Sequence, residues 1–263
     1  MNDMKDMANE LEQLQVELGL EDYEGQLMVP WFAYRMRLPK RPIPSVPDRP
    51  KITTQRLIVR PILPSDLDQL HSLRQRPETQ SQSKTRGRID QNKEETQQSI
   101  DMLNQKAHYH WYFGGFLQST GELIVEGGLP DCDIMESAAS GYPEAEFLVK
   151  PEYWRQGYGT EFFHAVMDSW WDLPREYRRV QLVPFLMPGK EPGDVATEGV
   201  VFQWEDGNEV AEGFFNKVLK EKDYRVFVSG SAASYDRRVG REGNTVTWKG
   251  VLAANPRIQP EGL

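Results

Sequence analysis

Residues 153–161 read YWRQGYGTE and place two glycines, Gly157 and Gly159, at the start of an apolar run, TEFFHAVMDSWW, that has the composition of a helix. A glycine turn that opens a helix presents unpaired backbone N–H groups beside the positive end of the helix dipole. Glycine also allows the backbone angles of the turn and leaves room for a phosphate. The stretch therefore predicts a phosphate-binding turn; the alternative is a tight turn that only joins a strand to a helix.

Two common phosphate loops do not fit this turn. The fingerprint GxGxxG lacks its last glycine after Gly159, and the P-loop lacks a Lys–Ser/Thr pair after Gly157. The wider stretch KPEYWRQGYGTEFF (150–163) instead resembles the acyl-coenzyme A loop of the GNAT N-acetyltransferase superfamily, in particular the branch of ribosomal-protein N-terminal (alanine/serine) acetyltransferases. The residues that match the loop of that branch directly are Pro151, Glu152, Tyr153, Trp154, Gly157, Tyr158, Thr160 and Glu161.

Two further segments support the resemblance. TQRLIVRPILPSDLDQL (54–70) is similar to the opening strand and first helix of the family, and GELIVEGGL (121–129) to one strand of its hairpin. The resemblance implies an α/β (α+β) GNAT fold, in which a central mixed, mostly antiparallel twisted sheet is splayed at the strand before the coenzyme loop and carries helices on both faces. It also implies an acyltransferase that uses acetyl-CoA as co-substrate for N-acylation.

The resemblance also indicates which residues bind the coenzyme. The strand Phe147, Leu148 and Val149 is expected to offer backbone groups to the pantetheine arm, and its donors would polarise the thioester carbonyl. The pyrophosphate is expected to accept hydrogen bonds from the N–H groups of the turn, which are those of Arg155, Gln156, Gly157, Tyr158, Gly159 and Thr160.

Three carboxylates are candidates for the catalytic base that direct attack by an amine needs. Glu146 and Glu144 share one face of the strand before the turn, and Glu126 lies on the preceding strand. The tyrosine that serves the family as acid corresponds to Leu219 here, and its coenzyme-contacting asparagine to Glu212. These departures keep a second interpretation open, a non-catalytic GNAT-fold protein that binds acyl-CoA as a sensor.

The chain divides into three parts by composition. Residues 1–50 predict a helix with an apolar stripe over 4–18, which docks on its own chain or pairs with a second copy, followed by a proline-rich arm that cannot form a central strand. Residues 51–255 are expected to form the acyltransferase domain, with a loop insertion over 187–207. Residues 256–263 form a tail.

Charge and composition narrow the partners. The chain has 40 acidic and 31 basic residues, a net charge of −9 that disfavours nucleic acid as a partner. The single cysteine indicates a cytoplasmic protein, and no apolar run is long enough for a membrane span. No cysteine or acidic residue completes a metal-ligand set beside His108 and His110, so no metal is expected. A small-molecule or amino-acid-like amine is favoured as acceptor over a protein N-terminus.

Overall fold

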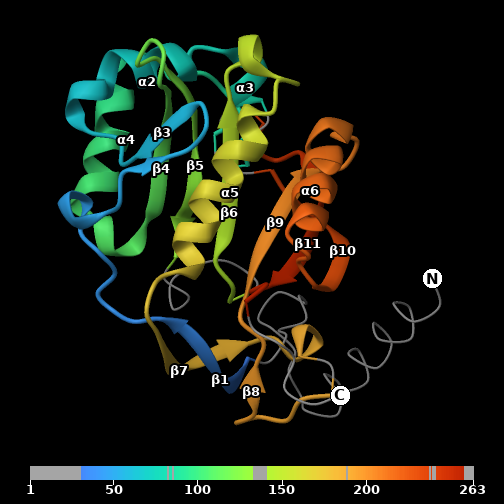
Figure 1. Ribbon diagram of the computed structural model, residues 1–263. Coiled ribbons are helices and arrows are strands. Elements are labelled where there is room, and N and C mark those ends of the chain that lie inside the picture. Colours follow the sequence, from blue (N-terminus) through green and yellow to red (C-terminus); the bar gives the residue numbers. More distant parts are fainter. Residues whose placement is uncertain are drawn as a thin grey trace.

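The architecture is taken from a computed structural model that describes residues 31–257 except 82, 85, 133–140, 188, 237, 239 and 240. An eight-stranded sheet forms its centre, in the strand order β10-β11-β9-β6-β5-β4-β3-β2 (Figure 1). All neighbours pair antiparallel except β6 and β9. The strands are β2 (Ile52–Thr53), β3 (Leu57–Arg60), β4 (Trp111–Leu117), β5 (Leu123–Asp131), β6 (Glu144–Val149), β9 (Gly199–Glu205), β10 (Val226–Tyr235) and β11 (Thr245–Ala254).

Helices cover both faces of this sheet, as the sequence predicts. The helices α2 (Leu67–Arg74) and α4 (Lys93–Gln105) pack on one face, with the short α3 (Pro77–Gln80) near β6. The helices α5 (Tyr158–Trp171) and α6 (Glu209–Glu221) pack on the other (Figure 1). The main core lies under α5, where the buried aromatic residues include Trp111, Phe113, Phe162, Phe163 and Trp170.

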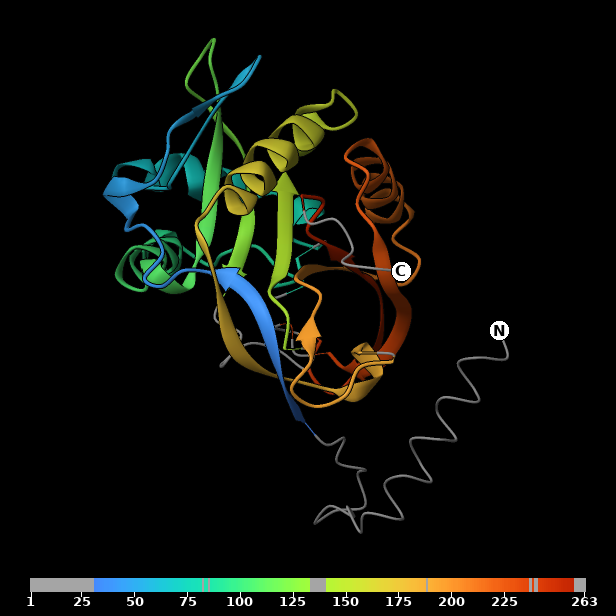
Figure 2. The ribbon, with the colours of Figure 1, turned by 60° about the horizontal axis from the view of Figure 1, so that its bottom comes forward.

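A second, three-stranded sheet of order β7-β1-β8 lies at one end of the main sheet (Figure 2). Its strands are β1 (Phe32–Pro39), β7 (Arg175–Leu182) and β8 (Val195–Ala196). The prediction that the proline-rich arm forms no central strand is therefore wrong for β1, which is the middle strand. No proline lies between Phe32 and Leu38, so every N–H there can pair, and alternate side chains (Tyr34, Met36 and Leu38) are buried.

The expected loop insertion over 187–207 is also corrected by the structure. This stretch contains β8 and β9, and β9 is the parallel partner of β6. The sequence of β9, GVVFQWE, is rich in β-branched and aromatic residues, which favour a strand. The glycines and prolines that precede it make this pattern hard to recognise in the sequence. The expected helix over residues 4–18, with its pairing to a second copy, lies outside the described residues, and the domain boundaries stay predictions.

Candidate active site

The main sheet opens between β6 and β9. The two strands pair in parallel only at Glu144 with Val201 and at Ala145 with Phe202. Beyond Ala145 they separate, and a cavity of ≈ 450 Å³ lies in the opening. Its walls are the end of β6, the turn before α5 and one side of α6. The predicted splay is therefore present at the predicted strand.

The glycine turn closes one end of the cavity. Gly157, the residue before α5, has φ 84°, and Arg155 has φ 60°, so both adopt the left-handed region. No side chain caps the helix, and its first turn closes with the bond from Glu161 N to Gly157 O at 3.0 Å. The first N–H groups of α5 thus lack intrahelical partners at the cavity wall, beside the positive end of the helix dipole.

Arg56 and Glu161 hold this turn in place. The Glu161 carboxylate accepts hydrogen bonds from Arg56 N (2.7 Å), Arg56 Nε (2.7 Å) and Thr54 Oγ1 (2.6 Å). The Arg56 guanidinium also donates to Gln156 O at 2.8 Å and lies 4.1 Å from the Tyr158 ring centroid. Burial opposes the charge of Glu161, but the bonds from Thr54 and Arg56 outweigh it and lower its pKa. The conformation of the turn is therefore fixed from outside the cavity.

Most of the residues predicted to bind the coenzyme line this cavity. The exceptions are Gln156, whose amide donates to Glu152 O, and Tyr158, which packs against Tyr153 and Arg56. The opposite wall on α6 was not predicted; Gly213, a glycine inside a helix, was the available signal in the sequence. The cavity residues that were not predicted are Thr79, Tyr153, Trp154, Val210, Ala211, Gly213, Phe214, Phe215 and Lys217.

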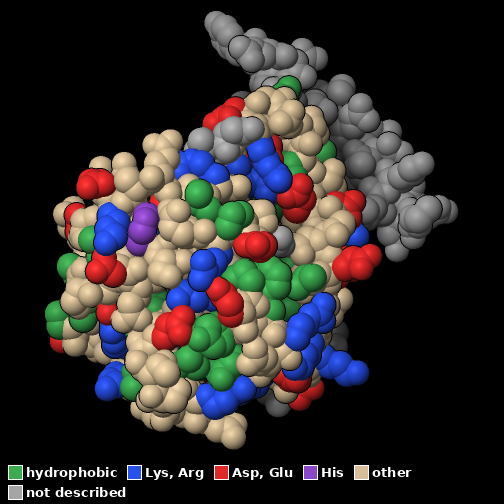
Figure 3. Space-filling model, turned by 90° about the horizontal axis from the view of Figure 1, so that it is seen from above, with side chains coloured by type: hydrophobic (Ala, Val, Ile, Leu, Met, Phe, Trp, Pro, Cys, Tyr) green, Lys and Arg blue, Asp and Glu red, His purple; other side chains and the backbone are tan. Residues whose placement is uncertain are grey.

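The mouth of the cavity combines apolar and basic groups. Seen from the side of the α5 N-terminus, hydrophobic side chains gather on this face with Lys and Arg side chains around them (Figure 3). Arg155 and Lys217 both line the cavity, and Lys217 Nζ lies 3.5 Å from Thr160 Oγ1. An apolar groove that ends at cations and free N–H groups suits a ligand with an apolar arm and a phosphate end.

Glu144 and Glu146 share one face of β6, as predicted, and this face lies opposite α5. Both contact the segment between α3 and α4. The Glu146 carboxylate accepts hydrogen bonds at Oε1 from Ser83 Oγ (2.8 Å) and Lys84 N (3.0 Å). The Glu144 carboxylate pairs with Lys84 Nζ. Glu146 Oε2 has no hydrogen-bond partner among the described residues, so one oxygen of this carboxylate is available to a ligand.

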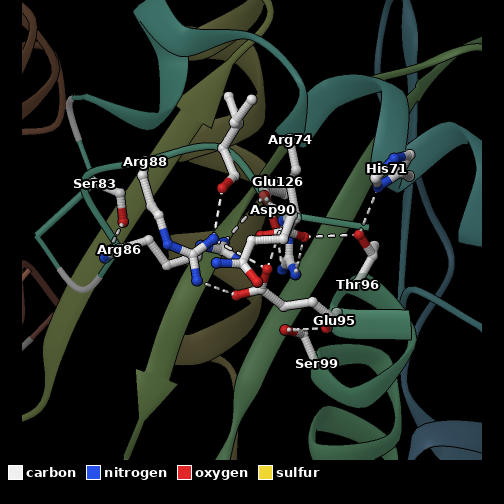
Figure 4. A network of polar contacts seen from close by, with 12 residues as sticks. His71, Arg74, Ser83, Arg86, Arg88, Asp90, Glu95, Thr96, Ser99 and Glu126 are labelled. Carbon is white, nitrogen blue, oxygen red and sulfur yellow. Dashed lines mark hydrogen bonds and ion pairs between the residues drawn. The ribbon is translucent and has the colours of Figure 1, made fainter. Parts of the chain in front are cut away.

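Glu126, the third candidate base, lies fully buried on the same face in a network of ion pairs (Figure 4). Arg74 donates to both of its oxygens, at 3.0 and 2.8 Å, and Tyr112 OH donates at 3.2 Å. Arg86 lies 3.4 Å away. Burial opposes the charge of Glu126, but the guanidinium groups of Arg74 and Arg86 outweigh it and lower its pKa. Such a carboxylate is a poor proton acceptor.

The residues at which the sequence departs from the family pattern lie in or near α6 and away from the cavity. Leu219, at the position of the acid tyrosine, is buried in the core. The nearby Tyr224 is also buried, with its hydroxyl accepting a bond from Trp171 Nε1 at 2.7 Å; burial raises its pKa. Glu212 pairs with Lys249, and Asn208 caps the helix through Ala211 N. None of these side chains lines the cavity.

Two negative findings apply to the described residues only. They contain no group of three or more His, Cys, Asp or Glu side chains placed to hold a metal ion. Within the same residues, every helix is too short or too polar to cross a membrane.

Comparison with known proteins identifies the domain. Residues 56–186 match the model of the acetyltransferase (GNAT) domain. The chain therefore carries a GNAT acetyltransferase domain, the domain of acetyl-CoA-dependent acetyltransferases. No curated protein sequence matches the chain.

The chain is also similar to solved structures of acetyltransferases. The ribosomal-protein-S5-alanine acetyltransferase of Vibrio fischeri superposes with a TM-score of 0.53 at 14% identity, covering 80% of this chain and 98% of that one. A GNAT acetyltransferase of Bacillus anthracis has a TM-score of 0.49 at 11% identity, covering 77% and 97%. An acetyltransferase of Salmonella typhimurium that modifies the N-terminal serine of ribosomal protein L7/L12 has a TM-score of 0.48 at 14% identity, covering 77% and 98%.

Proposed function

We propose that the cavity between β6 and α6 binds acetyl-CoA and that the protein transfers the acetyl group to a small amine. The observation that carries this proposal is the cavity itself: it begins where β6 and β9 separate and ends at the glycine turn. A long ligand with an apolar arm and a phosphate end fits these two ends.

The turn supports binding of the pyrophosphate. The N–H groups of Gly157, Tyr158, Gly159 and Thr160 come at the start of α5, where a phosphate is stabilised by hydrogen bonds and by the helix dipole. Lys217 adds a positive charge from α6. Hydrogen bonds to a charged group contribute about 1.5–3 kcal/mol each, so a few of them suffice to position the coenzyme.

The exposed edge of β6 supports binding of the pantetheine arm. Lys150 N donates to Ile124 O, so the N–H of Lys150 points toward β5. Because the N–H and C=O groups of successive residues point to alternate sides of a strand, those of Phe147 and Val149 point to the other side, where β9 has already separated. Val149 O accepts bonds from Thr79 Oγ1 (3.0 Å) and Trp154 Nε1 (2.6 Å), which leaves the groups of Phe147 for the coenzyme.

We propose Glu146 as the base. Its Oε2 is available on the sheet face next to the splay, whereas Glu144 holds Lys84 and Glu126 is held by two arginines. The neutral amine attacks the thioester carbonyl, its proton passes to Glu146, and the carbon–sulfur bond breaks. Ordinary thiols have a pKa of about 8.5, so the sulfur can leave as thiolate without a tyrosine acid.

The cover over this face favours a small acceptor. Gly87, between α3 and α4, lies against Arg238 of the β10–β11 connection: a Cβ added to Gly87 would be 2.7 Å from Arg238 Cδ. The two segments thus meet above the sheet face that carries Glu144 and Glu146. A flexible protein N-terminus needs an open path to the base, whereas a small amine does not. We also propose a cytoplasmic location, because the single cysteine cannot form an internal disulfide.

Two measurements test this function. Calorimetric titration with acetyl-CoA should show binding to one site, and release of free thiol should follow when a panel of small amines is added. Glu146→Gln should lower kcat about 10²–10⁴-fold without changing the Kd for acetyl-CoA. Glu94→Gln, on the exposed surface of α4, is the matched control and should behave as wild type.

The outcomes separate the alternatives. Binding without turnover across the amine panel would favour a coenzyme-binding sensor. Absence of binding would contradict both interpretations. Full activity of Glu146→Gln would remove Glu146 as the base.

A further inference from the structure

One lysine is held on the sheet face that carries Glu144 by three different kinds of group. Lys84, between α3 and α4, donates hydrogen bonds through Nζ to the Glu144 carboxylate and to the Gln203 amide oxygen. The same Nζ lies 5.9 Å from the centroid of the Trp248 ring. A carboxylate, an amide oxygen and an aromatic face are the groups that bind an ammonium ion in proteins.

These three groups come from neighbouring strands of the main sheet. Glu144 is on β6, Gln203 on β9 and Trp248 on β11, which lie side by side in that order. The absence of a side chain at Gly250 makes room for Gln203, since a Cβ there would be 2.8 Å from Gln203 Cγ. The sheet therefore supplies all three groups, and none of them comes from the segment that carries Lys84.

The arginine side chains around the site are paired with other carboxylates, so the Glu144 carboxylate remains for the ammonium. Arg238 lies 5.0 Å from the Trp248 ring, but it is already paired with Asp236 (2.6 Å) and Glu205 (2.8 Å). Glu205 also pairs with Arg241, and the carboxylate of Glu126 is taken by Arg74 and Arg86. Among the described residues, Glu146 accepts hydrogen bonds only from neutral donors, Ser83 Oγ and Lys84 N.

Lys84 can leave this site without its backbone moving away. The segment is anchored separately, by the bonds of Ser83 Oγ and Lys84 N to Glu146. The Lys84 side chain is 33% exposed, so it can turn into solvent. A flexible lysine side chain of this kind can be exchanged for another ammonium ion.

We propose that Glu144, Gln203 and Trp248 form an ammonium-binding subsite, which Lys84 fills in the free protein and which one amino group of the acceptor fills during turnover. The subsite stands by itself, and its assignment to the acceptor rests on the proposed function. Because these groups stabilise the charged form of an amine, they oppose its attack on a thioester. The bound ammonium is therefore an anchor, and a second amino group of the acceptor reacts.

The position of Glu146 fits this division. It lies two residues beyond Glu144 on the same face of β6, about 7 Å along the strand. A flexible compound with two amino groups, such as a diaminoalkane, can place one at Glu144 and the other at Glu146. The reaction at the second group is the transfer described above: the nitrogen–carbon bond forms, the carbon–sulfur bond breaks and the proton passes to Glu146.

The ammonium subsite is tested without acetyl-CoA. Lys84→Ala removes the occupant, and n-butylammonium has the four carbons and the charged end of a lysine side chain. Titration followed by NMR should show at least tenfold tighter binding of n-butylammonium to Lys84→Ala than to wild type. Lys84→Met, which keeps the stem but not the charge, is the matched control and should bind as weakly as wild type.

Two further arms decide whether the binding is specific. Neutral n-butanol should not bind to Lys84→Ala, and adding Glu144→Gln to that variant should abolish binding of n-butylammonium. Equal binding to wild type and Lys84→Ala, or binding that survives Glu144→Gln, would overturn the subsite. Circular dichroism of each variant checks that the fold is intact.

The acceptor assignment is tested with acetyl-CoA present. With 1,4-diaminobutane as acceptor, Glu144→Gln should raise KM at least tenfold with the Kd for acetyl-CoA unchanged, and n-butylamine should be the poorer acceptor in wild type. A KM that does not respond to Glu144→Gln would overturn the assignment. If acetyl-CoA does not bind at all, the proposed function fails while the subsite, measured separately, does not.

Discussion

Gly159 is the position at which a single side chain should block the coenzyme. It faces the cavity from the first turn of α5, between β6 and α6. A Cβ added there would lie 3.4 Å from Val149 Cγ2 and 3.4 Å from Phe214 Cε2, which is van der Waals contact without overlap. Alanine should therefore fit, whereas each further carbon adds about 1.5 Å of reach into the opening between these two walls.

The expected loss can be worked from the contacts. Leucine at position 159 would occupy the space in front of the first N–H groups of α5. Loss of two hydrogen bonds to a phosphate, at about 1.5–3 kcal/mol each, removes about 3–6 kcal/mol. Because about 1.4 kcal/mol corresponds to tenfold in affinity, Gly159→Leu should weaken acetyl-CoA binding at least a hundredfold.

Calorimetric titration of three proteins is the assay. Wild type and Gly159→Ala should bind acetyl-CoA with Kd values within tenfold of each other, and Gly159→Leu should show a loss of at least a hundredfold. Thermal melts should place all three within a few degrees, since the cavity is open at this position. Wild-type affinity in a folded Gly159→Leu protein would refute the placement of the pyrophosphate.

Three other predictions concern the residues that support the site. Gly157→Val should disturb the turn and weaken acetyl-CoA binding, because a left-handed conformation costs about 1–2 kcal/mol for residues with a Cβ; Gly157→Asn should be better tolerated in the same titration. Arg56→Met should raise the Kd for acetyl-CoA about tenfold by freeing the turn, whereas the exposed Lys93→Met should leave it unchanged. Because the folded pKa of Glu126 lies below 4.5, its charge stabilises the fold above that pH, and this contribution is lost as the pH falls through the folded pKa. Glu126→Gln should lower the free energy of unfolding by about 3–5 kcal/mol at pH 7 and flatten its decline below pH 4.5; denaturant melts with an unchanged acid slope would contradict this.

The coenzyme end of the site could be predicted because its determinants are local. The glycine turn, the strand before it and the helix after it are contiguous, so YWRQGYGTE and its flanks carry the geometry. The structure has α5 at Tyr158–Trp171 and β6 at Glu144–Val149, as the sequence indicates. The GNAT fold, with its mostly antiparallel sheet and helices on both faces, follows from the same resemblance.

The parts that could not be predicted depend on long-range pairing. Whether a proline-flanked segment becomes an edge or a middle strand depends on its partners, and β1 pairs with β7, which is far away in the sequence. The run that forms β9 is short and follows a stretch rich in glycine and proline. The roles of the three carboxylates differ because Arg74 and Lys84 reach two of them, and no spacing rule links these residues.

Hydrogen–deuterium exchange with and without acetyl-CoA tests the central claim most directly, because it reports where the coenzyme binds. The account predicts slower amide exchange in two segments, residues 147–149 of β6 and residues 155–160 of the turn. It predicts no change in β1, which lies in the other sheet. Protection at another place, or unchanged exchange in the glycine turn at saturating acetyl-CoA, would contradict the account.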